Sequence, residues 1–150
     1  MSWQGYVDQL IKTDALDGAA IVGLDDGLVY AHSPGFSLEK HAGSLPNELG
    51  EEVKVSIDEL AGLLHVVKHN GNIATPPGFW LNKVRYVLVE WRDDINTGYY
   101  KCKDGGATVA KTTKLAVVGT WSQKVIKGRS GGRCNEVIEN IAHEFIKAQF

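Results

Sequence analysis

Residues 84–122, with the sequence VRYVLVEWRDDINTGYYKCKDGGATVAKTTKLAVVGTWS, contain four short runs with the composition of β-strands. The runs are rich in β-branched and aromatic residues, and polar turn residues such as Asp104-Gly105-Gly106 and Thr113-Lys114 separate them. Short turns connect antiparallel neighbours, whereas parallel strands need a long crossover. The stretch therefore predicts an antiparallel sheet with strands at residues 84–91, 98–103, 107–112 and 115–121.

The residues before this stretch predict three more strands. Residues 79–81 read Phe-Trp-Leu and are expected to pair with residues 84–91 around an Asn82-Lys83 turn. Residues 19–24 and 28–31 are apolar and flank Asp25-Asp26-Gly27. An acidic turn with glycine between two apolar runs is typical of a β-hairpin.

Three segments have the spacing of amphipathic helices. The first follows Ser2, which is a good N-cap residue. The second starts with the capping-box pattern Ser56-Ile57-Asp58-Glu59 and continues to about Lys68, and the third opens at Gly131-Gly132. Their apolar positions are Trp3, Tyr6, Val7, Leu10 and Ile11 in the first, Leu60, Leu63, Leu64 and Val67 in the second, and Val137, Ile138, Ile141, Ala142 and Phe145 in the third.

The order of elements is helix, two strands, helix, a run of antiparallel strands and helix. This order favours an α+β fold in which the terminal helices pack on a single antiparallel β-sheet. The length of 150 residues, with 43% hydrophobic and 23% charged residues, suits one ordinary globular domain. We therefore expect residues 1–150 to form a single domain.

Residues 33–55 interrupt this pattern with a polar segment. They predict a surface loop that contributes no core strand, with enough apolar groups to pin one helical turn. A loop of this length without signs of disorder is usually functional or contains a short element of its own. Its turn-forming residues are Pro34, Gly35, Gly43, Pro46 and Gly50, and its sizeable apolar residues are Phe36, Leu38, Leu45 and Leu49.

The bulk properties indicate a cytoplasmic protein. The formal net charge of −2 gives no overall attraction to nucleic acid or to a membrane surface. The first residues do not resemble a signal peptide, and no apolar stretch is long enough to span a bilayer. Two cysteines, Cys102 and Cys134, are too few for a disulfide framework and favour a reducing compartment.

Three arrangements could indicate a reactive or ligand-binding site, but each has an ordinary explanation. His65 and His69 could share a metal, yet without a third ligand nearby they suit a solvated helix end. Cys134 could be a nucleophile near His143, although a cysteine on the apolar side of a helix start is more often core. Residues 129–133 resemble an anion-binding loop but lack the ending of a nucleotide loop. We expect no metal, no cofactor and no enzymatic activity.

The aromatic residues near the two ends of the chain are more informative. Trp3 and Tyr6 lie on the first helix, Tyr30 ends the second strand, and Phe150 follows the last helix. Any one of them could belong to the core, but both helices already have an adequate aliphatic stripe. If the two helices pack side by side, the rings form an exposed aromatic surface. Such surfaces bind polyproline II peptides, because flat rings stack on the pyrrolidine faces of a preformed ligand.

Several segments of the chain resemble the profilin family. The N-terminal run Met1-Ser2-Trp3-Gln4-Gly5-Tyr6-Val7-Asp8 is the most specific match. Weaker matches follow in order at residues 19–23 and 28–31, in the glycine-rich segment before the last helix, and at residues 134–139. The resemblance covers the chain except roughly residues 36–55, which look like an insertion in a divergent member.

The resemblance implies a profilin-like fold, with the N- and C-terminal helices side by side on one face of the sheet and a further helix on the other. It also implies a protein that binds monomeric actin and proline-rich segments of actin-assembly proteins such as formins, and that regulates filament assembly. Profilins often bind phosphoinositides as well. The implied location is the cytoplasm and the cytoskeleton.

The resemblance also assigns a polyproline-binding set. The family's aromatic pair falls on Trp3 and Tyr6, its third aromatic on Tyr30 and its terminal tyrosine on Phe150. Where the family commonly has His or Tyr in the last helix, this chain has Glu144, with His143 beside it. The implied polyproline-binding residues are Trp3, Tyr6, Tyr30, His143, Ile146 and Phe150.

The family's actin face uses the late strands, the loop before the last helix and the first turns of that helix. Basic residues on this face suit actin, which is acidic, because they steer association. Glu90 occupies a position that is usually basic in animal members, and residues 36–55 either extend this side or only decorate the surface. The implied actin-binding residues are Arg85, Glu90, Lys101, Lys103, Arg129, Gly132, Arg133, Asn135, Glu136 and Glu139.

Two other readings compete with an actin-binding adaptor. A sensor or scaffold domain with a profilin-like layout would hold a small ligand in an interior cleft and would have no role with actin. Such a domain has no reason to place Trp3 and Phe150 on its outer surface. The second alternative is a small hydrolase that uses Cys134 and His143.

Overall fold

The structure is a computed structural model that describes residues 2–74, 77–124 and 130–150. Its helices and strands in chain order are α1 (Trp3–Lys12), β1 (Gly18–Gly23), β2 (Val29–His32), β3 (Lys40–Pro46), β4 (Glu52–Asp58), α2 (Glu59–Lys68), β5 (Phe79–Leu81), β6 (Val84–Arg92), β7 (Thr97–Cys102), β8 (Gly105–Lys111), β9 (Leu115–Ser122) and α3 (Gly131–Lys147).

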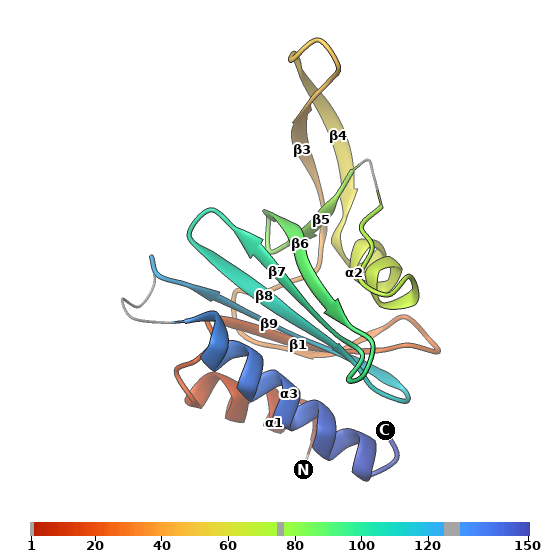
Figure 1. Cartoon of the computed structure of the whole chain (residues 1–150), viewed down its shortest axis with the longest axis vertical. Coiled ribbons are helices and arrows are strands. Elements are labelled where there is room, and N and C mark those ends of the chain that lie inside the picture. Colours follow the sequence, from red (N-terminus) through yellow and green to blue (C-terminus); the bar gives the residue numbers. More distant parts are fainter. Residues whose placement is uncertain (1, 75–76, 125–129) are drawn as a thin grey trace.

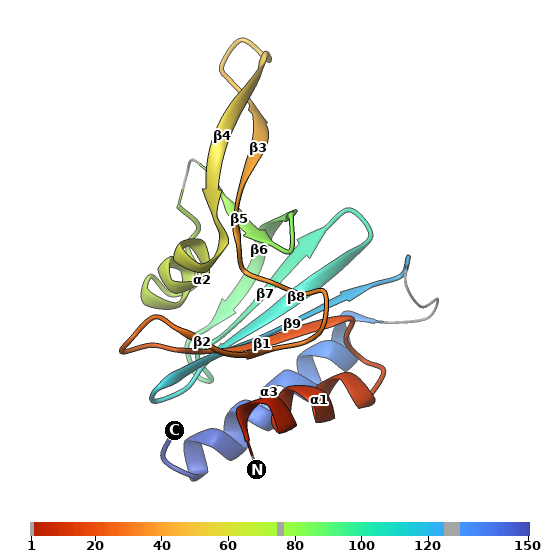
Figure 2. The same ribbon diagram turned by 180° about the vertical axis from the view of Figure 1, so that it is seen from behind.

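A seven-stranded sheet organises the molecule, with the strand order β2-β1-β9-β8-β7-β6-β5. Every neighbouring pair is antiparallel, as the short turns predicted. Helices α1 and α3 lie side by side on one face, and α2 lies on the other (Figures 1 and 2). The predicted fold class is confirmed.

The sheet separates two hydrophobic cores because successive side chains of a strand point to opposite faces. In β9, Val117 belongs to the core under α1 and α3, while Val118 belongs to the core under α2. In β8, Ala110 and Val109 divide in the same way. All four side chains are fully buried, so these strands lack the polar alternation of a half-exposed strand.

The N-caps place the starts of the helices. The Ser2 hydroxyl accepts a hydrogen bond from the Gly5 N–H at 3.0 Å, as predicted. The prediction that the second helix starts at Ser56 is wrong, because α2 begins at Glu59. Ser56 and Ile57 are extended and pair with β3, and Asp58 caps α2 by accepting from the Ala61 N–H at 3.1 Å.

The prediction of a loop with one helical turn at residues 33–55 is wrong for residues 40–46 and 52–55, which form strands. Strands β3 and β4 form a long two-stranded hairpin that projects from the body of the protein (Figure 1). At its tip, the Asn47 side chain accepts hydrogen bonds from the Leu49 and Glu51 N–H groups, both at 2.9 Å. Gly50 takes a φ of 77°, which L side chains rarely adopt.

The segment that leads into the hairpin also contributes to the core. Phe36 is only 2% exposed and packs with β1 and β9, so closely that a Cβ added at Gly18 would lie 2.5 Å from its ring. Glycine at position 18 therefore makes room for Phe36. A segment that was predicted to lie only on the surface is anchored to the sheet by this ring.

Candidate functional site

Five aromatic side chains from both ends of the chain meet in what we call the aromatic cluster. Its members are Trp3 and Tyr6 of α1, Tyr30 of β2, Phe145 of α3 and Phe150. They meet because α1 packs beside α3 and also contacts β1 and β2. Helix spacing places Trp3 and Tyr6 on one side of α1 because residues three apart are neighbours on a helix.

Trp3 is the centre of the aromatic cluster. Its ring centroid lies 6.1 Å from that of Tyr6, 5.9 Å from Tyr30, 5.6 Å from Phe145 and 5.1 Å from Phe150. Phe145 is 2% exposed and forms the floor, whereas Tyr30 and Phe150 remain 38% and 39% exposed. Edge-to-face and tilted pairs at these distances are favourable, typically by about 0.5–1.5 kcal/mol beyond area burial.

Backbone hydrogen bonds hold Phe150 against the cluster. Its N–H donates to the Phe145 carbonyl at 2.8 Å, and the Thr112 hydroxyl donates to the Phe150 carbonyl oxygen at 2.8 Å. The Lys114 N–H also donates to this carbonyl oxygen. The last ring of the chain is therefore fixed to the loop between β8 and β9.

An acidic residue fixes the Tyr30 ring. The Tyr30 hydroxyl donates to Asp26 Oδ2 at 2.7 Å, and the Leu28 N–H donates to Asp26 Oδ1 at 3.0 Å. The hydrogen bond from the Leu28 N–H, followed by that from Tyr30, holds the pKa of Asp26 below its usual value. The same bond to Asp26 raises the pKa of Tyr30. Because its proton is committed to Asp26, Tyr30 presents a ring and an acceptor to a ligand, but no donor.

The remaining donors of the cluster are the indole N–H of Trp3 and the hydroxyl of Tyr6. Neither has a hydrogen-bond partner among the residues that the structure describes, and both side chains are half-buried. A polyproline II peptide has carbonyl groups without internal partners. Two donors beside stacked rings therefore match its unpaired acceptors.

Two residues of the predicted polyproline-binding set are not among these rings. His143 and Ile146 are exposed on α3, and His143 makes none of the described ring contacts of the cluster. His143 is two residues from Phe145, a rotation of about 200° around the helix. Phe145 was predicted only as a core residue, although its position four residues beyond Ile141 on the α1-facing stripe was a signal for its place under the rings.

A second candidate site, which we call the strand–helix surface, lies on the α3 side of β6 and β7 and on the adjoining flank of α3. Arg85 and Val87 are two residues apart in β6 and so point to the same side, and Val87 pairs directly with Lys101 of β7. Arg85, Lys101 and Lys103 border one shallow hollow, with Val87 46% exposed at its floor. The structure therefore brings three predicted cations together around an apolar residue.

Helix α3 is attached to β7 and to its neighbour β8 by two polar contacts. The Tyr99 hydroxyl donates to the Glu139 carboxylate, and the Thr108 hydroxyl donates to Asn135 Oδ1 at 2.5 Å. Burial raises the pKa of Tyr99 to about 12, and the bond to Glu139 acts in the same direction. Glu139 and Asn135, both predicted to contact actin, also hold the helix on the sheet.

The other predicted actin residues are distributed over the same region. Glu90 is exposed in β6 and pairs across the strands with Tyr99, which places it near Glu139. Gly132 is exposed in the first turn of α3, where Arg133 and Glu136 form an ion pair at 3.8 Å. Arg129 lies outside the described residues.

The alternative catalytic and metal readings find little support in the geometry. Cys134 is fully buried, and its thiol lies 3.5 Å from the Thr108 hydroxyl, so a substrate cannot reach it. The His65 and His69 rings stack at 4.1 Å, and the His69 Nδ1 atom lies 2.9 Å from the His65 carbonyl oxygen. The described residues contain no group of three or more His, Cys, Asp and Glu side chains placed to hold a metal ion.

Comparisons with known proteins identify the family. The family model described as Profilin matches residues 1–150. The chain belongs to the profilin family. It is 32% identical over 151 residues to Profilin-1B of Acanthamoeba castellanii, with all of both chains covered. It is 29% identical over 149 residues to the profilin of Tetrahymena pyriformis, with 93% of each chain covered.

Solved structures give the same result. Acanthamoeba castellanii profilin IA is similar at a TM-score of 0.73 and 29% identity, over 99% of this chain and all of that one. Mouse profilin IIa, solved in complex with a double repeat from the FH1 domain of mDia1, shares the fold at a TM-score of 0.67 and 17% identity. That comparison covers all of both chains.

Membership of the family places the chain among non-enzymatic actin-binding proteins. The profilin therefore acts as a regulator of actin assembly and not as an enzyme. Among the described residues, no helix is both long and apolar enough to cross a bilayer.

Proposed function

We propose that this profilin binds proline-rich peptides on the aromatic cluster and monomeric actin on the strand–helix surface. The convergence of Trp3, Tyr6, Tyr30 and Phe150 over Phe145 carries the proposal. Rings that the fold already holds in place lose little entropy when a stiff polyproline II ligand stacks on them. Half-exposed rings provide the stacking area, and the donors of Trp3 and Tyr6 select the extended backbone.

The strand–helix surface suits a large acidic partner. Arg85, Lys101 and Lys103 surround Val87, so the surface combines positive charge at its rim with an apolar centre. Charge at the rim steers association, while apolar contacts at the centre slow dissociation. Glu90, Gly132, Arg133, Asn135, Glu136, Glu139 and Arg129 complete the proposed actin-binding set.

We further propose that residues 1–150 form a single profilin domain that works in the cytoplasm with the actin cytoskeleton. The FH1 repeat bound by mouse profilin IIa points to formins as the class of proline-rich partner. Phosphoinositides are a secondary proposal, because the cations of the strand–helix surface suit phosphate groups as well as an acidic protein. His143 and Ile146 remain proposed accessory contacts at the border of the cluster.

The test is to measure the binding of the purified protein to polyproline resin and, separately, to monomeric actin. Retention on the resin that free polyproline elutes, together with saturable actin binding, is the expected result. Binding to neither ligand contradicts the proposed function, while binding to actin alone contradicts the assignment of the aromatic cluster.

A further inference from the structure

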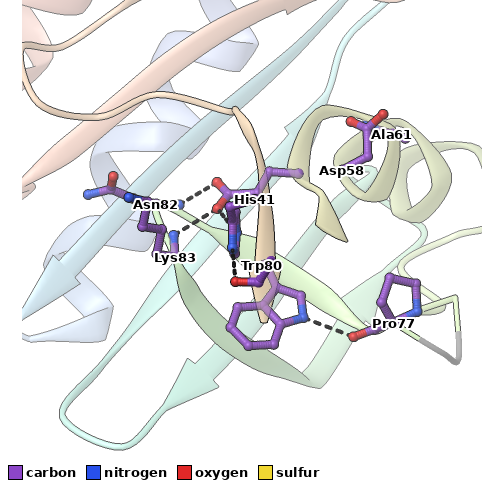
Figure 3. Close-up of polar contacts among 9 residues, drawn as sticks. His41, Asp58, Ala61, Pro77, Trp80, Asn82 and Lys83 are labelled. Carbon is purple, nitrogen blue, oxygen red and sulfur yellow. Dashed lines mark hydrogen bonds and ion pairs between the residues drawn. The ribbon is translucent and has the colours of Figure 1, made fainter. Parts of the chain in front are cut away.

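A buried carboxylate fixes the base of the β3–β4 hairpin. Glu59 is 1% exposed, and its two oxygens accept hydrogen bonds from the Asn82 N–H at 2.6 Å and the Lys83 N–H at 2.7 Å. His41 Nε2, on β3, lies 2.7 Å from Glu59 Oε2. Figure 3 shows His41, Asn82 and Lys83 converging at this point. One side chain therefore ties the hairpin to α2 and to the β5–β6 turn.

Trp80 of β5 is the second anchor. The His41 ring packs edge-on against Trp80 with centroids 5.6 Å apart, and the indole N–H donates to the Pro77 carbonyl at 2.8 Å. A Cβ added at Gly43 would lie 3.3 Å from the Trp80 ring, so the ring passes close to β3. The hydrogen-bonded carboxylate of Glu59 and the ring of Trp80 therefore together fix the orientation of the hairpin.

The register of the hairpin separates an apolar face from a polar one. Residues that pair directly share a face, and so do residues two apart. On the apolar face, Leu45 pairs with Val53, Gly43 pairs with Val55, and His41 pairs with Ile57. The opposite face has the pairs Ala42 with Ser56, Ser44 with Lys54 and Pro46 with Glu52.

The apolar face is covered at its base and open toward its tip. Ile57 is 1% exposed because it packs beneath Gly43, close to Trp80. Further out, Leu45 and Val55 are half-buried, Val53 is 43% exposed, and Leu49 at the tip is 81% exposed. Uncovered apolar residues on one side of a rigid hairpin are expected at a site of protein contact.

The apolar face continues into the strand–helix surface. Trp80 pairs directly with Arg85, so these side chains lie on the same face of the sheet. Arg85 and Val87 are two residues apart, and Val87 pairs with Lys101. A continuous path therefore leads from Leu45 and Val53 across Trp80 to the cations of the strand–helix surface.

We propose that the apolar face of the hairpin, formed by Leu45, Val53 and Val55, is an additional contact surface for the actin monomer. The inference rests on the proposed function, because the occupant is identified by continuity with the strand–helix surface. The cations at Arg85, Lys101 and Lys103 select an acidic protein, and the uncovered aliphatic side chains add apolar area beside them. The anchored base lets the hairpin bind without losing the entropy of an arm that must first become ordered.

The experiment compares two double variants of the full chain in binding to monomeric actin. Leu45→Ser with Val53→Ser removes apolar area without changing charge, and Ser44→Ala with Ser56→Ala makes an uncharged change on the opposite face. We expect the first variant to bind actin about 5- to 20-fold more weakly, mainly through faster dissociation, as is usual for interface changes. We expect the second to stay within about 2-fold of the wild type.

Two further measurements keep the outcomes separate. Both variants should bind polyproline normally, because α1 and α3, which carry most of the aromatic cluster, lie at the opposite end of the molecule from the hairpin (Figure 1). Both should also melt near the wild-type temperature, because the substituted side chains are exposed or half-buried. Wild-type actin affinity in the Leu45→Ser, Val53→Ser variant overturns the inference, provided that Lys101→Glu still weakens binding. A wild-type protein that does not bind actin overturns the proposed function itself. Concentration-dependent dimerisation that the apolar-face variant abolishes assigns the face to a second copy and also overturns the inference.

Discussion

Helices α1 and α3, which carry most of the aromatic cluster, and the β3–β4 hairpin lie at opposite ends of the molecule (Figure 1). The cluster and the hairpin are stabilised in different ways. In the cluster, Trp3 contacts four other rings, so the stabilisation is spread over many weak contacts. In the hairpin, the polar contacts at the base converge on one carboxylate, Glu59, which is shared among three polar groups beside the Trp80 ring. We therefore expect that removing the Trp3 ring weakens ligand binding, whereas removing the Glu59 carboxylate destabilises the fold.

The largest effect is expected at Glu59. Glu59→Ala removes the acceptor of the part-buried hydrogen bonds from the Asn82 and Lys83 N–H groups, and it removes the partner of His41. A hydrogen bond to a charged group typically contributes about 1.5–3 kcal/mol, so we expect a loss of about 3 kcal/mol in the free energy of unfolding, measured by chemical denaturation.

Glu52→Ala is the matched control, because Glu52 is an exposed carboxylate on the same hairpin, and its cost should stay within about 0.5 kcal/mol. Glu59→Gln retains one acceptor oxygen and should be intermediate. If Glu59→Ala is as stable as the control, the carboxylate does not hold the hairpin.

Trp3→Ala tests the other end of the molecule. Removing the central ring should weaken binding to a proline-rich peptide by about 2 kcal/mol or more, roughly 30-fold, because binding energy at such sites is concentrated in a few aromatic residues. Actin affinity should remain near that of the wild type. The measurement is titration calorimetry with a polyproline peptide.

Val84→Ala serves as a control for Trp3→Ala because Val84 is 42% exposed and lies in β6, away from the aromatic cluster. A folded Trp3→Ala protein that binds the peptide like this control places the proline site elsewhere.

Charge reversal on the strand–helix surface should have a smaller effect that depends on salt. Lys101→Glu with Arg133→Glu is expected to slow association with actin about 10-fold at low ionic strength, and the defect should shrink as salt rises, because screening weakens steering. Stopped-flow kinetics at two salt concentrations measures this effect. Lys12→Glu, on the exposed side of α1, should leave the rate close to normal. A defect that is independent of salt argues against electrostatic steering by these residues.

The smallest effect is expected at Asp26. Asp26→Ala frees the Tyr30 hydroxyl, so the ring loses its tether, and polyproline affinity should fall by about 2-fold.

Because Asp26 raises the pKa of Tyr30, this pKa should return toward its ordinary value in the variant. The hydrogen bond from Tyr30 to Asp26 stabilises the folded protein at neutral pH. This contribution is lost as the pH rises through the raised pKa of Tyr30, because the phenolate has no proton to donate. Alkaline spectrophotometric titration of both proteins checks the shift, and an unchanged titration curve contradicts the contact.

The parts of the fold with strong local patterns were predictable from the sequence. The strands at residues 79–122 follow from short turns and β-branched runs, and the cluster residues Trp3, Tyr6 and Tyr30 follow from helix spacing and the profilin motif. Ser2 capped its helix as expected because an N-cap depends only on neighbouring residues.

The hairpin was missed although part of its signal was visible. Val53, Val55 and Ile57 alternate with polar residues, which is the period of a strand, but the glycines and prolines around them dominated the interpretation. The Ser56-Ile57-Asp58-Glu59 pattern fits a capping box, but in the structure Ser56 and Ile57 are strand residues that pair with β3. The burial of Glu59 was not predictable locally, because its partners lie 18 to 24 residues away.

The central claim is that actin and proline-rich peptides bind to separate surfaces of one profilin. The most direct measurement is to titrate a polyproline peptide into the wild-type protein alone and into the protein saturated with monomeric actin. We predict peptide dissociation constants that agree within about 2-fold and a stable complex of all three components by gel filtration. Displacement of actin by the peptide, or loss of peptide binding in the presence of actin, would contradict the claim.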